Sequence, residues 1–483
     1  MTENVYLVID VGTGNVRVAL VTPAGKVVAI AADVVRYHRD TRYTDALYFE
    51  PEALWAQILE LCRRVMAGID GARVAAITSS SQREGVVLLD ASGREVAGMP
   101  NIDHRGRDFE DILADKDRVY RLTGRYPTSL FSAFKVLGIA RREPERAAQI
   151  SVMVSISEWV LFRLSGKTCY EHAQASETLL YDVENRRWSE ELCADFAIDP
   201  AILPPLAYAG DVLGDVLPEW AGRFGISPGT KVVVGGADTQ LAILSTLPST
   251  DDVVIVSGTT TPVVKIVDQY ITDDRQRTWT NSHALKQLFI LETNAGVTGL
   301  NLQRFKAIFY PNEPYEQMER EILAAIDKGP QCWAALGSLI ADEKRPLIRG
   351  GFVLPTPLHH ELTRGDFAFA LLWDLACSIY ENYRNLCDVV PHREPYLWAC
   401  GGGMQSTLLL RFLAGLTGKE IRVRTHFTQS TVAGGAVICN SVLQLAEEMD
   451  ASFEATLPDG EWDTTGWYNR WKKNREALKL HQS

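Results

Sequence analysis

Two short segments of the chain have the composition of phosphate-binding loops. Residues 7–15 read LVIDVGTGN and residues 253–261 read VVIVSGTTT. In each segment a buried β-type run breaks into glycine and threonine. Glycine lets the backbone turn with positive φ and brings N–H groups within reach of a phosphate, while the hydroxyls add donors. Because about half the chain separates the pair, it predicts two related lobes with one nucleotide between them.

Asp10 is the candidate ligand for a metal ion. It lies between an expected buried strand and a glycine turn, where a carboxylate is costly unless its charge is compensated. Hydrated Mg²⁺ would compensate it, since magnesium uses one or two carboxylates together with water and phosphate oxygens. The alternative is that Asp10 caps its own turn. Arg17 on the next expected strand would reach the same loop, where it could bind phosphate, pair with a carboxylate or form only a surface salt bridge.

Asp238 is the candidate catalytic base. Residues 232–240 read VVVGGADTQ, which again places a carboxylate after a buried strand, with glycines that allow close approach by a ligand. An aspartate held beside an alcohol can take its proton as the oxygen attacks a γ-phosphoryl group. The alternative is an N-cap for a helix that begins at Thr239.

Two polar clusters in the first half could recognise a polyol. Residues 81–85 read SQREG and follow an expected strand, while residues 101–105 read NIDHR. Amide, guanidinium and carboxylate groups in consecutive positions can hydrogen-bond several hydroxyls. Each cluster could equally be a charged turn.

Residues 401–406 read GGGMQS and lie between an expected strand and an expected helix. Small residues there would let an adenine ring lie against the backbone, although a triple glycine also suits a tight turn. The segment lacks the spacing of the dinucleotide fold and the G-K-[ST] ending of a P-loop. No histidine pattern of a zinc enzyme and no G-x-S-x-G nucleophile elbow is present, so neither class of enzyme is expected.

Hydrophobic periodicity predicts the elements that position these segments. Strands are expected at 5–9, 16–21, 27–32, 74–78, 231–235, 253–256 and 396–400, with a turn at 23–25. Helices are expected at 51–67, at 156–164 as an amphipathic segment, around residues 408–413, and at 471–480. Residues 105–210 are expected to form a mainly helical insertion that caps a sheet. This alternation predicts an α/β fold.

Length and charge limit the function classes. A chain of 483 residues exceeds what one core usually supports, so two domains with a break near the middle are expected. The net charge of −12 argues against nucleic acid or an anionic membrane surface as a partner, and favours small-molecule chemistry.

The cysteines and the N-terminus indicate the compartment. Eight cysteines include no C-x-x-C pair, which favours reduced thiols over a disulfide framework or a zinc ribbon. The chain begins without a basic leader and apolar signal core, and no apolar run is long enough to span a bilayer. We therefore expect a cytoplasmic protein that does not bind a membrane.

The motifs in combination resemble the FGGY carbohydrate kinases. Those that carry the resemblance are D-x-G-T from residue 10, GGAD at 235–238, SGTT at 257–260 and GGG at 401–403, and it extends over nearly the whole chain. It implies an α/β fold of two ribonuclease-H-like domains of the actin and Hsp70 type, with ATP and sugar in the interdomain cleft. The implied domains are residues 1–246, with the sugar site, the base and the helical insertion, and residues 247–483, with the nucleotide site.

The resemblance also implies roles for single residues. Asp238 is the implied catalytic base, Asp10 and Asp238 are the implied metal ligands, and ATP and Mg²⁺ are the implied cofactors. The residues implied for ATP and phosphate are Gly12, Thr13, Gly14, Asn15, Arg17, Gly258, Thr259, Thr260, Gly402, Gly403 and Gln405. Those implied for the small-molecule substrate are Gln82, Arg83, Glu84, Asp103 and Gln240. Because many relatives pair through the second domain, a homodimer is one expectation.

Three segments indicate which members of the family the chain resembles most. Residues 82–88, 101–105 and 156–159 are most similar to autoinducer-2 kinases, which phosphorylate a linear hydroxylated diketone. Glycerol kinases share the Arg-Glu pair but usually follow it with Thr, and xylulokinases usually carry Met-His there. Gln429 replaces an acidic residue common in the family, and Gln303 stands where Trp is frequent. Open alternatives are a pentulose or polyol kinase of conventional carbon metabolism and a non-catalytic, actin-like ligand sensor.

Overall fold

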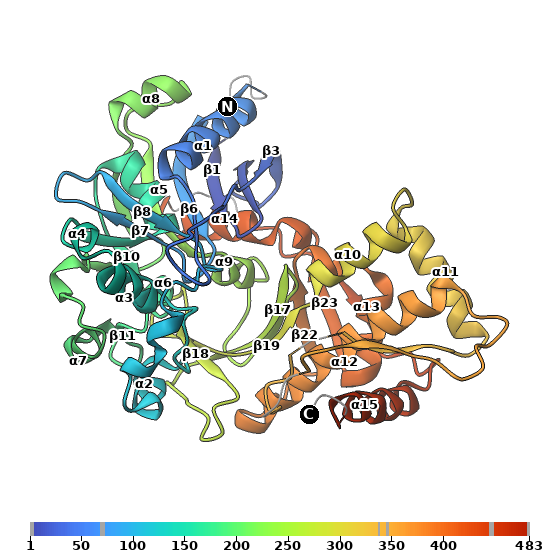
Figure 1. Cartoon of the computed structure of the whole chain (residues 1–483). Helices are drawn as coiled ribbons and strands as arrows, with labels where there is room; N and C mark the ends of the chain where they lie inside the picture. The colour runs from blue at the N-terminus through green and yellow to red at the C-terminus, as the bar shows by residue number, and fades with distance from the viewer. Residues whose placement is uncertain (1–3, 68–72, 337–338, 344–346, 444–448, 481–483) are drawn as a thin grey trace.

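Each half of the chain contains one large β-sheet. The computed structural model in Figure 1 describes residues 4–67, 73–336, 339–343, 347–443 and 449–480. The first sheet has six strands in the order β14 (Val212–Asp215), β15 (Lys231–Ala237), β6 (Arg73–Ser81), β1 (Asn4–Val11), β2 (Asn15–Val21) and β3 (Val27–Val34). The second has seven, in the order β18 (Trp279–Ser282), β19 (Phe289–Val297), β17 (Thr260–Val267), β16 (Val253–Val256), β22 (Tyr396–Cys400), β23 (Glu420–Arg424) and β24 (Phe453–Thr456). We call the part of the chain up to β15 the N-terminal lobe and the part from β16 the C-terminal lobe.

The two sheets repeat one topology. β1 pairs antiparallel with β2 and parallel with β6, and β16 pairs antiparallel with β17 and parallel with β22. The correspondence continues outward, because β15 and β23 are parallel to their inner neighbours and the edge strands β14 and β24 are antiparallel. The prediction of two related α/β lobes is confirmed.

The remaining elements are helices and short strands. The helices are α1 (Pro51–Met66), α2 (Lys116–Thr123), α3 (Ser132–Arg142), α4 (Pro144–Ala147), α5 (Ile156–Ser165), α6 (His172–Ala175), α7 (Glu190–Asp195), α8 (Pro218–Phe224), α9 (Asp238–Leu244), α10 (Gly299–Phe309), α11 (Tyr315–Asp327), α12 (Arg364–Val389), α13 (Thr407–Thr417), α14 (Ser430–Leu443) and α15 (Thr464–Leu480). The short strands are β4 (His38–Arg39), β5 (Leu47–Tyr48), β7 (Val86–Leu89), β8 (Glu95–Met99), β9 (Val152–Ser155), β10 (Tyr170–Glu171), β11 (Tyr181–Asp182), β12 (Arg187–Trp188), β13 (Leu206–Ala207), β20 (Trp333–Ala335) and β21 (Gly351–Val353).

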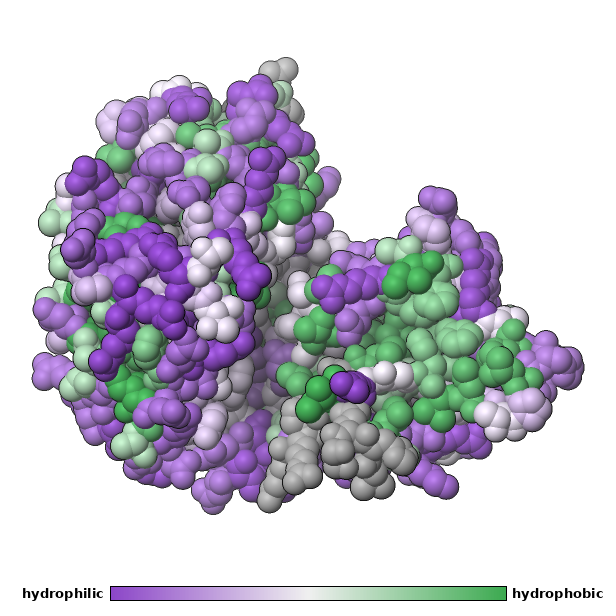
Figure 2. Space-filling model, viewed as in Figure 1, coloured by the Kyte–Doolittle hydropathy of each residue, from purple (hydrophilic) through white to green (hydrophobic). Residues whose placement is uncertain are grey.

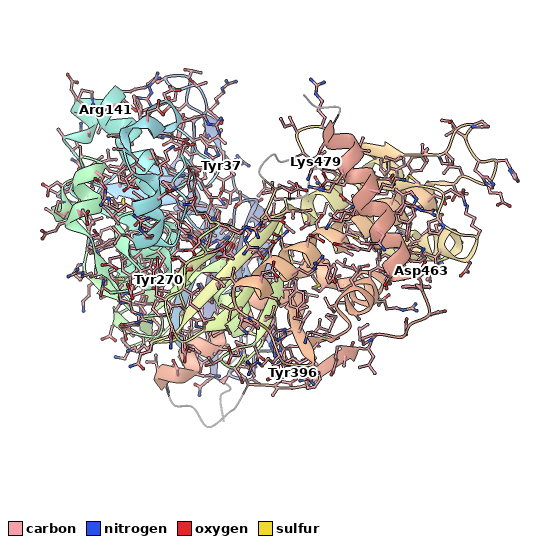
Figure 3. All side chains as sticks on the ribbon, turned by 90° about the horizontal axis from the view of Figure 1, so that it is seen from below. Tyr37, Arg141, Tyr270, Tyr396, Asp463 and Lys479 are labelled. Carbon is pink, nitrogen blue, oxygen red and sulfur yellow. The ribbon has the colours of Figure 1, made fainter. Side chains whose placement is uncertain are left out.

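All seven predicted strands are present, with ends that differ by up to three residues. The predicted insertion is mainly helical, and its helices α2 and α3 share a core with the small sheet β8-β7-β9. One expectation was wrong: α5 is not amphipathic, because it packs between the large sheet and the small sheet and eight of its ten residues are buried. The last helix, α15, begins seven residues before the predicted position, and in Figure 3 it runs between the labelled Asp463 and Lys479.

Two helices join the lobes. α9 contributes Leu241 to a core with the first sheet, and Ala242 and Ile243 to a core with the second. α14 comes late in the chain but packs on β1 and β6 of the N-terminal lobe (Figure 1), and its Asn440 accepts a hydrogen bond of 2.7 Å from Tyr6. The domain boundary between residues 246 and 247 remains a prediction. Because α14 belongs to the second half of the chain but packs on the N-terminal lobe, the two halves of the sequence do not correspond exactly to the two lobes. None of the described helices has the length and apolarity needed to cross a membrane.

Candidate active site

The two predicted phosphate loops are equivalent hairpins. The first connects β1 to β2, and the N–H of Gly12 donates to the carbonyl of Asn15 at 3.0 Å. The second connects β16 to β17, and the N–H of Gly258 donates to the carbonyl of Thr260 at 3.0 Å. Gly14, Asn15, Gly258 and Thr259 are exposed. Both loops therefore present backbone donors and hydroxyls at their surfaces, as a phosphate requires.

Side chains from elsewhere in the N-terminal lobe fasten the first loop. Asn101 donates to the Thr13 hydroxyl at 2.9 Å, and Tyr37 donates to the Thr13 carbonyl at 2.7 Å. Gln82 donates to the Gly12 carbonyl at 3.3 Å and to the Tyr37 hydroxyl at 3.2 Å. Figure 3 shows Tyr37 on the side of this lobe that faces the other lobe. The sequence carried no signal for Tyr37, since its role depends on a contact between distant segments.

The glycine run at 401–403 packs directly on the second loop. Gly401 has a φ of +93°, and a Cβ there would lie 2.3 Å from the carbonyl oxygen of Ser257. The N–H of Gly403 donates to the same oxygen at 3.3 Å. Gly402 and Gln405 are exposed beside it. The segment predicted to bind adenosine thus adjoins the loop predicted to bind phosphate.

The two predicted carboxylates lie at one edge of the first sheet. Ser80 on the central strand β6 pairs with Asp10 of β1 on one side and with Gly236 of β15 on the other. Asp238 follows Gly236 by two residues, at the start of α9. The charge of Asp238 contributes to raising the pKa of Asp10. Residues 228 positions apart in the chain therefore interact at one site.

Asp10 is buried and only partly compensated. Its Oδ2 accepts a hydrogen bond of 3.2 Å from Arg17, and its Oδ1 is buried with no hydrogen-bond partner among the described residues. Burial raises the pKa of Asp10 to about 6, although Arg17 opposes the shift. The carboxylate pairs with Arg17, one of the arrangements left open above. An unpartnered buried oxygen beside a second carboxylate is a suitable place for Mg²⁺ with its waters.

This burial leads to a prediction about stability. The folded chain holds a proton on Asp10 more tightly than the unfolded chain, so Asp10 lowers stability as pH rises from about 4 to 6, by about 3 kcal/mol at most. In the nucleotide-free protein, Asp10→Asn is therefore expected to raise the free energy of unfolding above pH 6, with the gain disappearing near pH 4. Urea unfolding of both proteins at pH 4 and pH 8 measures it. An equal difference at both pH values would show that the buried charge is not the cause.

Asp238 is half-buried in the first turn of α9. Its Oδ1 accepts hydrogen bonds from the Thr239 N–H at 2.6 Å and the Thr239 hydroxyl at 3.2 Å. The helix begins at Asp238 itself, one residue earlier than the N-cap alternative expected. Burial raises the pKa of Asp238, and the nearby charge of Arg83 opposes the shift. The arrangement places a carboxylate next to a guanidinium at the site predicted for the sugar.

Arg83 connects the lobes. Its two terminal nitrogens donate to Glu292 of β19 at 2.7 and 3.1 Å, and one of them lies 3.5 Å from Glu177. Glu84 beside it is buried with a φ of +58°, a strained value for a residue with a side chain. Burial and the charge of Glu177 raise the pKa of Glu84 to about 8. Sequence reasoning missed Glu177 and Glu292, because neither belongs to a recognisable motif.

The other predicted substrate residues are held by protein contacts. Gln240 donates to the Ser282 carbonyl of the C-terminal lobe at 2.9 Å, while its Oε1 has no hydrogen-bond partner in the part of the chain that the structure describes. Asp103 is fully buried and accepts from the Leu47 N–H at 2.8 Å and from Arg105 at 2.9 Å. Asp103 thus bonds within the N-terminal lobe, in a supporting position.

Figure 2 shows the surface hollowed between the two lobes. Two other surface pockets, of about 330 and 420 Å³, lie on the N-terminal lobe around Phe49 and Glu50. Their linings include none of the predicted site residues.

Comparisons of the sequence and of the fold with known proteins both find carbohydrate kinases. Residues 5–245 match the N-terminal domain of the FGGY family of carbohydrate kinases. The chain is 44% identical to a Bacillus subtilis protein named "Putative sugar kinase YoaC", over 99% of this chain and 98% of that one. It is 24% identical to an autoinducer-2 kinase of Yersinia enterocolitica, over 100% of this chain and 93% of that one. The crystal structure of Plasmodium falciparum glycerol kinase with ADP superimposes with a TM-score of 0.85 at 18% identity, covering 99% and 98% of the two chains, and confirms the two-domain fold.

Proposed function

The chain belongs to the FGGY family of carbohydrate kinases, and on this premise we propose that it transfers the γ-phosphoryl group of ATP to a hydroxyl of a small sugar, a polyol or an autoinducer-2-like hydroxylated metabolite. One observation carries the proposal. Asp10 pairs with Ser80 on one side, Gly236 pairs with Ser80 on the other, and Asp238 follows Gly236 by two residues. Both carboxylates therefore lie at the same end of the sheet, and an equivalent hairpin loop in each lobe presents donors suited to phosphate.

In the proposed mechanism Asp238 orients the acceptor hydroxyl and takes its proton as the oxygen attacks phosphorus. Backbone N–H groups of the loops at 12–14 and 258–260 stabilise the charge on the transferring group. Asp10 and Asp238 would hold Mg²⁺, which neutralises phosphate charge when bound. Closure of the lobes would exclude water and so limit hydrolysis of ATP.

The roles of the remaining residues follow from their contacts. Arg83, Glu84 and Gln240 are proposed to contact the acceptor, while Gln82 and Asp103 position the segments around it. The residues proposed to contact ATP are Gly12, Thr13, Gly14, Asn15, Arg17, Gly258, Thr259, Thr260, Gly402, Gly403 and Gln405. Residues 1–246 then supply the acceptor site and the base, and residues 247–483 most of the nucleotide site.

Acceptor-dependent release of ADP tests the proposal. With ATP and Mg²⁺ present, we expect at least one of a panel of C4 to C6 polyols, ketoses and 4,5-dihydroxy-2,3-pentanedione to raise ADP release at least about tenfold over the rate without acceptor. A coupled spectrophotometric assay measures it. If the protein bound ATP but no acceptor increased ADP release, the kinase proposal would be contradicted and the alternative of a non-catalytic, actin-like ligand sensor would be favoured. The presence of both carboxylates, Asp10 and Asp238, argues against that alternative.

The same panel decides between a kinase of autoinducer-2-like metabolites and a conventional pentulose or polyol kinase. We also propose a cytoplasmic location, because ATP is the donor and the eight cysteines are free thiols. The homodimer remains a proposal, which light scattering in solution would test.

A further inference from the structure

The predicted substrate site contains an unusual concentration of buried charge. The groups that interact there are Arg83, Arg125, Glu177, Asp238 and Glu292. They come from both lobes, since Glu292 lies on β19 of the C-terminal lobe. How these charges pair determines which charges a substrate can bring into the site.

The end of Arg83 that recognises carboxylates is already occupied. Both terminal nitrogens of Arg83 donate to the two oxygens of Glu292, at 2.7 and 3.1 Å. This forked pairing is the geometry by which a guanidinium binds a carboxylate, so a second carboxylate cannot take the same place. The Glu292 side chain is fully buried and that of Arg83 is 10% exposed, so water screens the pair weakly.

Glu292 carries its charge in the folded chain. Burial alone would raise the pKa of Glu292, but the charges of Arg83 and Arg125 outweigh burial and lower it. At neutral pH the negative charge of Glu292 therefore compensates the positive charge of Arg83.

The second arginine also pairs with a buried carboxylate, through one of its nitrogens. Arg125 donates to Glu177 at 2.5 Å, and its guanidinium lies 4.7 Å from the ring centre of Trp279. Its other two nitrogens, Nε and Nη1, are buried and have no hydrogen-bond partner within the described ranges. Glu177 also accepts from Asn281 of the C-terminal lobe at 2.7 Å. With Asp238 added, these two arginines face three carboxylates among the described residues, so neither arginine is left free to bind the carboxylate of an acid.

We propose that Glu292 is a specificity-determining residue: by occupying Arg83 from the opposite lobe, it selects uncharged polyhydroxy acceptors and rejects sugar acids. This inference rests on the proposed kinase activity. A sugar acid would bring a further carboxylate into a site where Glu177, Glu292 and Asp238 are acidic and both arginines are already paired, which is selection by charge repulsion as well as by contact.

The test compares Glu292→Gln with wild type. Gln keeps the shape of Glu but has no charge, so Arg83 loses the carboxylate that pairs with both of its terminal nitrogens. The probes are the best uncharged acceptor of the panel above and three acids, D-gluconate, D-xylonate and D-glycerate. The matched control is Glu321→Gln, because Glu321 also accepts a forked pair from an arginine, Arg364, at 2.7 and 2.8 Å, within the C-terminal lobe. Glu292→Asp, which restores the charge, is the rescue variant.

In wild type we expect kcat/KM for the uncharged acceptor to exceed that for each acid at least about 100-fold. In Glu292→Gln, the ratio of kcat/KM for the uncharged acceptor to kcat/KM for at least one acid is expected to fall at least about tenfold. The same ratio should be unchanged in Glu321→Gln, and in Glu292→Asp it should lie closer to the wild-type value. Two results would overturn the inference. One is that an acid is the best acceptor of the wild-type protein. The other is that Glu292→Gln folds but has the same ratio of kcat/KM values, uncharged acceptor over acid, as wild type.

Calorimetric binding separates the inference from the proposed function. If no acceptor releases ADP, the kinase proposal fails, and the affinities of the uncharged probe and the acids then decide the inference alone. Uncharged probes bound at least about tenfold more tightly than acids in wild type, but not in Glu292→Gln, would support it. Equal affinities, or no binding of any probe, would reject it. Thermal unfolding of each variant shows whether the fold is intact.

Discussion

Replacing Asp238 with asparagine is expected to lower kcat at least about 100-fold, the lower part of the range for a positioned base. Asparagine has nearly the same shape and still accepts the hydrogen bond that Asp238 receives from Thr239 at 2.6 Å. It cannot take a proton from the acceptor. Affinities for ATP and for the acceptor should therefore change little, and the loss should appear in kcat.

Steady-state kinetics and calorimetric titration together measure this effect. Asp215→Asn is a matched control, since Asp215 is exposed and, among the described residues, forms an ion pair with Lys231 alone, at 2.7 Å on the edge of the same sheet. The control should keep wild-type kcat. If Asp238→Asn turned over at the wild-type rate, Asp238 would not be the base and another group would have to accept the proton.

The substitution Gly235→Ala is expected to destabilise the protein by about 3 kcal/mol or more, the upper part of the range for overpacking a core. A Cβ at Gly235 would lie 1.8 Å from the carbonyl oxygen of Ser79. That oxygen belongs to the backbone of β6, which cannot move without disturbing the sheet. Because Asp238 follows three residues later, kcat should fall as well.

Urea unfolding at a single pH checks the stability effect. The control is Gly222→Ala, where a Cβ would meet nothing within 4 Å and the residue is exposed in helix α8. Alanine is expected to stabilise that helix by about 0.5–1 kcal/mol. Equal stability of Gly235→Ala and wild type would mean that β15 and β6 are less closely packed than the structure shows.

Much of the fold followed from local sequence. The strands at 5–9 and 253–256 and the helix at 51–67 have periodicities that near neighbours decide, and the structure contains all three. α5 was misjudged because the number of faces that a helix buries depends on what packs around it. Within the candidate site, glycine and threonine after a buried strand predicted a loop in each half, and the structure shows that each loop is a hairpin turn.

The sequence by itself determined the local chemistry: a carboxylate at the end of each of two buried strands and a loop of small and hydroxyl residues in each half. Only the tertiary structure decided which distant groups meet. It brought Glu292 to Arg83 across 209 positions of the chain, placed α14 on the sheet of the other lobe, and set Tyr37 against the first loop. The physical reason is that turn chemistry and periodicity depend on neighbouring residues, whereas the pairing of buried charges depends on how two separately formed sheets pack together.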